Sequence, residues 1–142
     1  MYRILLTAIV AIITTTSLQA QDINERKGIA LEGYDLVSYF EGNAEKGDKT
    51  HAASYMGVTY HFTTAEHLAT FKNDPERYLP EYGGYCAYAI AVTGDKVSVN
   101  PKTYEIRDDK LYLFYNAWGN NTLKKWLKDP ENLRQQADAN WQ

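Results

Sequence analysis

The sequence predicts an α+β fold, in which hairpins or a small antiparallel sheet pack against three to four short helices. Two stretches rich in aromatic and β-branched residues, at 55–62 and 104–115, each contain a central turn signal, which is typical of β-hairpins. Apolar residues recur at helical spacing around Phe71, Trp126 and Leu133. No linker divides residues 21–142, and a chain of this length can enclose one core, so we predict a single domain.

The first 20 residues have the pattern of a secretion signal peptide. Arg3 supplies a positive charge, an apolar core of ten residues follows at 4–13, and small and polar residues end at Ala20. A membrane-spanning helix needs about 20 apolar residues, so this core is too short to serve as one. We therefore predict a periplasmic or secreted protein without a membrane span after cleavage, with an uncleaved anchor as the alternative.

The charge balance excludes one class of partner. The chain has 15 basic and 18 acidic residues, a formal net charge of −3. A nucleic-acid-binding domain would require a basic face, so we expect no nucleic-acid partner.

In the first half of the chain, residues 33–40 are dense in aromatic and branched side chains and predict a short strand or a helical turn. Glycine, asparagine and aspartate then make residues 41–50 a loop. The hairpin that follows turns at Met56-Gly57, and strand alternation places Tyr60 and Phe62 on the same face.

A helix should follow this hairpin. Thr63 is the predicted cap, and Glu66 three residues later would complete a capping box. His67 lies on the flank of the apolar face that contains Phe71. Asp74-Pro75 should end this helix and begin a short turn through Tyr78.

The second half begins with a bend at 82–86, where two adjacent glycines permit positive φ and close approach of the backbone. A short strand is expected at 97–99 and a turn at Asn100-Pro101. The second hairpin should turn at Asp108-Asp109.

Two helices are predicted to close the chain. The first carries Leu123, Trp126 and Leu127 on one face. The second begins at Asp129-Pro130, with proline as its first residue.

Cys86 is the only cysteine of the chain, and it directly follows the double-glycine bend. Exported proteins usually pair their cysteines, and a lone thiol cannot form an intramolecular disulfide. Cys86 is therefore either a small buried residue or a sulfur that holds a metal or exchanges electrons. A redox role would require a thiol from another molecule, since no second cysteine can resolve an oxidised form.

Several separate motifs resemble the YHS family, and in particular its exported single-domain branch. One frame has the order Gly57, Tyr60, Phe62, Phe71, Asp74, Pro75, Glu76 and Tyr78. The opening Gly33-Tyr34-Asp35 with Val37 and Tyr39-Phe40, the Tyr82–Ala87 segment and the Leu111–Leu113 strand extend the resemblance over nearly all of residues 21–142. The resemblance implies an α+β domain that binds a transition metal.

The chain departs from this family where metal-associated members have cysteines. Thr63 and His67 stand at those two positions. Threonine cannot replace a thiolate, whereas imidazole binds zinc, copper and nickel. A thiolate and an imidazole together suit copper or zinc, so the resemblance implies metal handling or sensing with Cys86 and His67 as ligands. Asp35 and His51 are further candidate ligands.

Other functions remain open at this point. The chain is alternatively a structural or protein-binding module in which Cys86 is a buried core thiol, or a thiol-redox protein. Hydrolysis by Cys86, His67 and Asp35 is disfavoured because no nucleophile signature surrounds the cysteine, and we expect no catalysis. A pocket for a small aromatic or planar molecule is also predicted, lined by the tyrosines Tyr34, Tyr82, Tyr85 and Tyr88.

Overall fold

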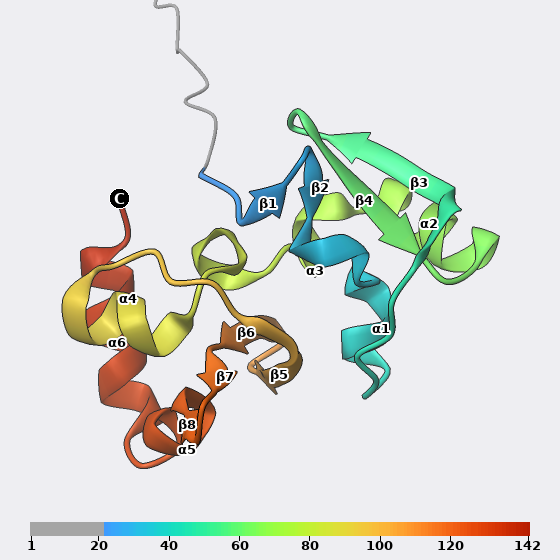
Figure 1. Cartoon of the computed structure of the whole chain (residues 1–142). Helices are drawn as coiled ribbons and strands as arrows, with labels where there is room; N and C mark the ends of the chain where they lie inside the picture. Colours follow the sequence, from blue (N-terminus) through green and yellow to red (C-terminus); the bar gives the residue numbers. More distant parts are fainter. Residues whose placement is uncertain (1–21) are drawn as a thin grey trace, which may run out of the picture.

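The computed structural model describes residues 22–142 and confirms the predicted α+β class (Figure 1). The predicted signal peptide, 1–20, lies outside the described residues. In the part of the chain that the structure describes, no helix combines the length and the apolar character needed to cross a bilayer.

The first half of the chain forms a four-stranded sheet with the order β1-β2-β4-β3. Its strands are β1 (Glu25–Arg26), β2 (Ile29–Ala30), β3 (Asp48–Tyr55) and β4 (Val58–Phe62). The sheet is mixed, because β2 pairs with β4 in parallel while the other two pairs are antiparallel. The sequence predicted hairpins or a small antiparallel sheet, and the parallel β2–β4 pair is an addition that it did not indicate.

The predicted β3–β4 hairpin is confirmed. Its two turn residues, Met56 and Gly57, have φ values of 50° and 81°. Positive φ at both positions matches the twist of the flanking strands, which is why two-residue hairpins favour this turn. Tyr60 and Phe62 are buried on one face of β4, as predicted.

Short helices cover this sheet. They are η1 (Leu31–Gly33), α1 (Leu36–Phe40), α2 (Ala65–Asn73) and α3 (Pro75–Tyr78). The ambiguous segment 33–40 is thus helical over most of its length. The predicted cap of α2 is wrong by one residue, because Thr64, not Thr63, accepts the hydrogen bond from the His67 amide at 3.0 Å. The helix ends before Asp74-Pro75, as predicted.

The second half contains more helix than predicted. Its elements are η2 (Glu81–Gly84), α4 (Ala87–Thr93), β5 (Asn100–Arg107), β6 (Lys110–Phe114), β7 (Asn116–Ala117), β8 (Asn120–Asn121), α5 (Thr122–Trp126) and α6 (Pro130–Asn140). The β5–β6 hairpin and the α6 start are confirmed. The predicted strand at 97–99 is wrong, since β5 begins only at Asn100. The sequence analysis missed α4 and the β7–β8 hairpin.

The double-glycine bend receives the N-terminal segment. The amide of Asn24 donates to the Gly83 carbonyl at 2.8 Å, and its side-chain amide donates to the Gly84 carbonyl at 3.0 Å. A Cβ atom on Gly83, whose φ is 62°, would lie 2.0 Å from the Asp22 carbonyl oxygen. Glycine at position 83 is therefore required both by its left-handed conformation and by close packing.

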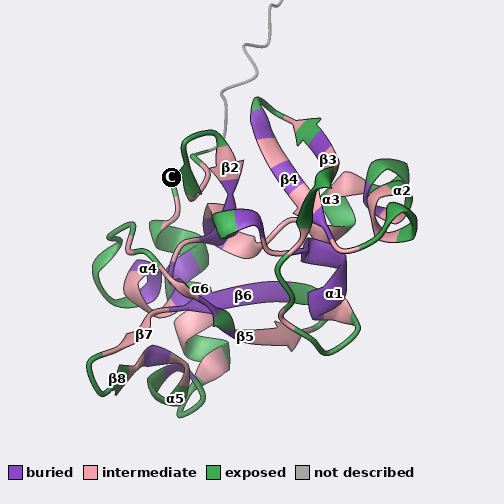
Figure 2. Ribbon diagram, turned by 45° about the vertical axis from the view of Figure 1, so that its right-hand side comes forward, coloured by how far each residue is buried: buried purple, intermediate pink, exposed green. Residues whose placement is uncertain are grey.

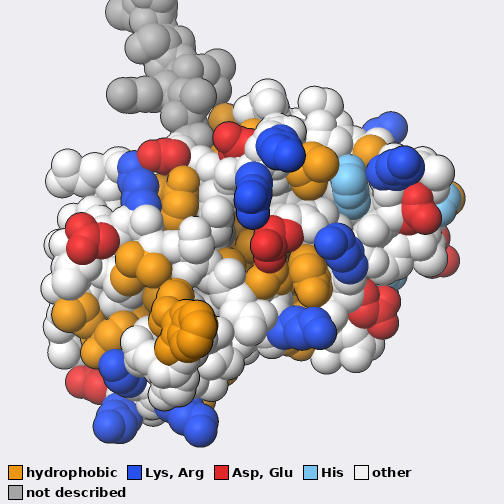
Figure 3. Space-filling model, in the orientation of Figure 1, with side chains coloured by type: hydrophobic (Ala, Val, Ile, Leu, Met, Phe, Trp, Pro, Cys, Tyr) orange, Lys and Arg blue, Asp and Glu red, His pale blue; other side chains and the backbone are white. Residues whose placement is uncertain are grey.

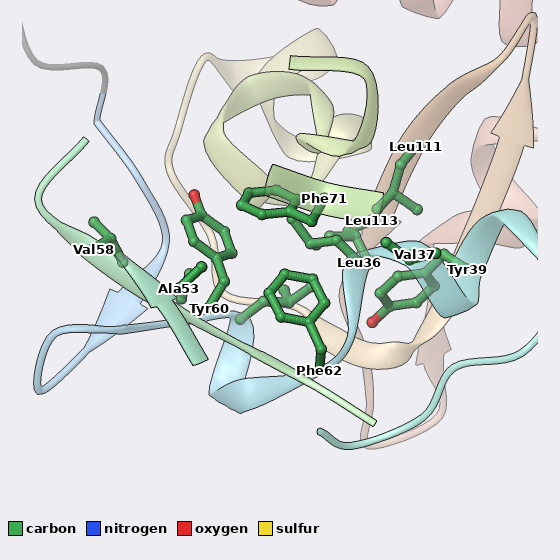
Figure 4. Close-up of a cluster of buried hydrophobic side chains, with 12 residues drawn as sticks. Leu36, Val37, Tyr39, Ala53, Val58, Tyr60, Phe62, Phe71, Leu111 and Leu113 are labelled. Atoms are coloured by element: carbon green, nitrogen blue, oxygen red, sulfur yellow. The ribbon is translucent and has the colours of Figure 1, made fainter. Parts of the chain in front are cut away.

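Strand β6 is buried over most of its length (Figure 2), and it separates two hydrophobic cores. Successive side chains of a strand point to opposite faces, so Leu111 and Leu113 enter the first core, while Tyr112 and Phe114 enter the second. The first core, which is drawn in Figure 4, comprises Ala30, Leu31, Leu36, Val37, Tyr39, Ala53, Val58, Tyr60, Phe62, Phe71, Leu111 and Leu113. The second comprises Tyr82, Ala87, Ile90, Ala91, Tyr112, Phe114, Trp126 and Ala137.

Candidate functional site

Cys86 lies in the interior, immediately before α4. Its side chain is 0% exposed. Its backbone pairs with Leu113 of β6, and its amide donates to the Val97 carbonyl at 2.9 Å. These contacts hold the cysteine between the middle of β6 and the segment that follows α4.

The Cys86 thiol has one polar neighbour, the hydroxyl of Thr122, at a Sγ–Oγ1 distance of 3.3 Å. A threonine hydroxyl has a single proton, and Thr122 donates it to the Tyr115 carbonyl at 2.7 Å. The thiol must therefore be the donor to Thr122. A sulfur that donates its proton is neutral, whereas both metal binding and nucleophilic attack need the thiolate.

Asp35 and His67 meet in the other half of the molecule. The Asp35 carboxylate is 0% exposed, and its Oδ1 caps α1 by accepting from the amides of Val37 and Ser38 at 2.8 and 3.2 Å. Its Oδ2 accepts from the amide and the hydroxyl of Thr63, both at 2.8 Å, and lies 2.7 Å from His67 Nδ1. This carboxylate therefore joins the start of α1 to the junction of β4 and α2.

His67 is held between two acidic side chains. Its Nε2 lies 3.2 Å from Glu41 Oε1, opposite the nitrogen that contacts Asp35. Burial alone would lower the pKa of His67, but the hydrogen bond and charge of Asp35 and the charge of Glu41 outweigh it and raise the pKa above its usual value. The two carboxylates thus favour the imidazolium form more than water would, and they oppose metal binding to that extent, because a metal needs the neutral imidazole.

The structure does not bring Cys86 and His67 together. Helix α2, which carries His67, and helix α4, which follows Cys86, lie at opposite sides of the molecule in both views (Figures 1 and 2). His51 lies on β3 and is hydrogen-bonded to neither residue. Across residues 22–142, no group of three or more histidine, cysteine and acidic side chains is placed to hold a metal ion. The predicted ligands therefore do not fit a shared transition-metal site.

The four predicted pocket tyrosines also separate. Tyr82 is buried, donates to Asp138 Oδ1 at 2.8 Å, and its pKa is raised by burial and by that carboxylate. Tyr85 has its hydroxyl 3.4 Å from the Ile23 carbonyl, and Tyr34 packs against the first core. Only Tyr88 lines the groove described next, so the four side chains do not form one pocket.

A groove lies over Cys86, between α4 and the β7–β8 hairpin, and we call it the Cys86 groove. Its volume is about 370 Å³. Its apolar and aromatic walls come from Tyr88, Ala89, Val92, Val97 and Tyr115, and polar groups come from Thr93, Asp95, Asn120 and Thr122. The buried Cys86 forms part of its floor.

Sequence reasoning missed most of this groove, because neither α4 nor β7–β8 was predicted. The apolar run from Ala87 to Val92 is a signal that could have indicated α4. A second hollow, beside Leu36 and Tyr60, has a volume of only about 20 Å³. That volume accommodates about one water molecule, so this hollow cannot hold a larger ligand.

The thiol geometry leads to a testable expectation. A maleimide should label Cys86 only as fast as the protein opens, and rapidly in denaturant, because the folded side chain is fully covered. Zinc or copper should shift the melting temperatures of wild type and Cys86→Ser equally, or not at all. Rapid labelling of the folded protein, or a metal-induced shift that the serine variant lacks, would contradict the buried, proton-donating thiol.

Comparison with known proteins finds no match: no family model, no curated protein and no solved structure matches this chain.

Proposed function

We propose that this chain is a non-catalytic binding domain that takes a small aromatic or planar molecule in the Cys86 groove. The observation that carries the proposal is the groove itself, with its volume of about 370 Å³ and its mainly apolar lining. Small-molecule sites in proteins are typically concave, about 300–1,000 Å³ in volume, and apolar with a few polar groups that orient the ligand.

The residues of the groove suggest the ligand's chemistry. Tyr88 and Tyr115 offer ring faces and edges, which favour stacking with an aromatic molecule. Both tyrosines also carry a hydroxyl, which can donate a hydrogen bond to a ligand or accept one from it. Asn120 and Asp95 add an amide and a carboxylate to the lining. A planar molecule with one or two polar substituents would satisfy these groups.

The environment of the Cys86 thiol, at the floor of the groove, favours binding over catalysis. The Cys86 thiol is committed to Thr122, and a cysteine nucleophile would need a histidine beside it to act as base. The nearest candidate by sequence reasoning, His67, is held by Asp35 in the other half of the molecule. The copper or zinc function implied by the YHS resemblance stays a weaker alternative, tested by the metal titration above.

The experiment fills the groove. Val92 lines it and is 52% exposed, so Val92→Trp should occupy the groove without disturbing the core. Leu127, which is 51% exposed and does not line the groove, provides the matched control Leu127→Trp. A library of small aromatic fragments is screened by amide chemical shifts in the wild type and both variants.

We expect fragments that shift the amides of Ala89, Val97 and Tyr115 in the wild type and in Leu127→Trp. In Val92→Trp, binding of the same fragments should weaken at least about tenfold, because the indole takes the space of the ligand. The proposal would be overturned if the amides that shift lay outside the Cys86 groove, or if the fragments bound all three proteins with equal affinity.

A further inference from the structure

Trp118 is the most conspicuous apolar side chain on the surface. It lies in the turn between β7 and β8, and its side chain is 97% exposed. Its φ is 54°, a left-handed conformation that is unfavourable for a bulky residue. Neither packing nor turn geometry therefore explains a tryptophan at this position.

Three lysines follow this turn closely in the sequence. Lys124 and Lys125 lie on the exposed face of α5, and Lys128 follows directly after that helix. Leu127 lies between Lys125 and Lys128 in the sequence and is half-exposed, although the apolar spacing places it on one helix face with the buried Trp126. Residues 116–128 contain these three lysines and no acidic residue, although the chain as a whole has a net charge of −3.

The space-filling view (Figure 3) agrees with this local charge. Figure 3 shows basic side chains gathered over α5 at the lower left of the molecule, next to exposed hydrophobic side chains. We call the set Trp118, Lys124, Lys125, Leu127 and Lys128 the tryptophan–lysine surface. Lys125 also lies over the Tyr88 ring, 5.8 Å from its centroid, which holds one end of this surface against α4.

We propose that the tryptophan–lysine surface docks the domain on an anionic lipid bilayer. Tryptophan prefers the headgroup region of a membrane, where its ring is apolar and its N–H stays hydrated. Lysines beside it are attracted to anionic lipids, and the combination of both signals is typical of peripheral membrane binding. An indole at the tip of a tight turn can enter the headgroup layer without a preformed pocket in its partner.

The charge of the tryptophan–lysine surface favours an anionic bilayer over a nucleic acid as its partner. The positive charge is confined to a few residues around one short helix, too small an area for a nucleic-acid site on a protein of net negative charge. The inference is independent of the ligand proposed for the Cys86 groove, since it rests on residues that lie mainly outside that groove.

The test measures vesicle binding by the protein described in this structure. Vesicles of equal parts phosphatidylcholine and phosphatidylglycerol are compared with pure phosphatidylcholine by co-sedimentation and by tryptophan fluorescence. We expect binding only to the anionic vesicles, with a blue shift in emission that Trp118→Phe abolishes, because Trp126 is already buried and the partly buried Trp141 packs against the second core. Trp118→Ala should weaken binding on the order of tenfold or more.

The charge contribution has its own matched control. Replacing Lys124, Lys125 and Lys128 together by glutamine should weaken binding on the order of 100-fold, the combined effect of three lysines near an anionic surface. Replacing the exposed Lys49, Lys72 and Lys102 by glutamine alters the net charge equally and should leave binding unchanged. The proposal would be overturned if both triple variants lost the same affinity for anionic vesicles, or if the wild type did not bind those vesicles. It would also be overturned if the wild type bound a polyglutamate chain as tightly as it binds the vesicles.

Discussion

Asp35→Ala should lower the free energy of unfolding by about 3–5 kcal/mol, the range observed when one partner of a buried charged pair is removed. The variant removes the carboxylate that accepts hydrogen bonds at three places in the fold. These are the first amides of α1, the amide and hydroxyl of Thr63, and the His67 imidazole. These groups lie on segments about 30 positions apart in the chain, so no local rearrangement can replace the lost carboxylate. Chemical denaturation measures the effect.

Asp48 provides the control for this variant. Its carboxylate also accepts from the amide and the hydroxyl of one threonine, Thr50, each at 2.8 Å, but on an exposed part of β3. Water can replace the Asp48 carboxylate, so Asp48→Ala should change stability far less than Asp35→Ala. Similar losses in the two variants would show that burial of Asp35 is not the source of its contribution.

The contact between Asp35 and His67 should also make the stability of the fold depend on pH. The pKa of His67 is raised in the folded state, so protonated His67 stabilises the fold fully below the pKa of an unfolded histidine. This contribution should fade as the pH rises through the raised folded-state pKa. In Asp35→Asn, NMR titration should show a lower His67 pKa than in the wild type, and this part of the stability profile should flatten. An unchanged pKa would contradict the ion pair.

Trp126→Ala should destabilise the protein by about 3–5 kcal/mol, because it opens a cavity in the second core. The indole is 0% exposed, its ring lies 5.4 Å from those of Tyr112 and Phe114, and its Nε1 donates to Glu105 Oε2 at 2.8 Å. Trp118→Ala, the same substitution at an exposed position, should change stability by no more than about 0.5 kcal/mol. Thermal and denaturant unfolding of both variants make the comparison.

Trp126→Phe separates the contribution of packing from that of the hydrogen bond to Glu105. Phenylalanine keeps much of the apolar volume and loses the hydrogen bond to Glu105, which Arg107 also contacts at 2.5 Å. We expect a loss of about 1–2 kcal/mol from the missing hydrogen bond and the smaller ring. A loss as large as that of Trp126→Ala would mean that the hydrogen bond, rather than packing, dominates at this position.

The elements predicted correctly are those whose signals lie within a few residues. The Met56-Gly57 turn and the Asp108-Asp109 turn both have positive φ at their two central residues. Asp74-Pro75 ends α2, and Pro130 begins α6, because proline's ring and missing N–H act on the adjacent backbone. Such signals depend on local sterics, so a sequence alone is enough to read them.

The elements and residues that were predicted wrongly depend on more than such local signals. Thr63 and Thr64 are both suitable caps for α2, and the choice fell to Thr64 because Thr63 is bound to Asp35, 28 residues away. Leu127 fits the apolar pattern of α5 and is nevertheless exposed, although its backbone is still helical and its amide donates to the Leu123 carbonyl at 2.9 Å. For the cap of α2, a distant contact decided between two locally equivalent residues, and for Leu127 the apolar spacing alone did not determine burial.

The amino-acid sequence by itself determined the α+β class, the hairpin turns, the bend at Gly83 and the presence of one lone thiol, since each follows from local backbone preference or composition. Only the tertiary structure decided the environments of the candidate site residues. It set Cys86 against Thr122 and His67 against Asp35, partners 36 and 32 positions apart. Such pairings depend on how the two cores pack on either side of β6, and local periodicity has no information about distances of that kind.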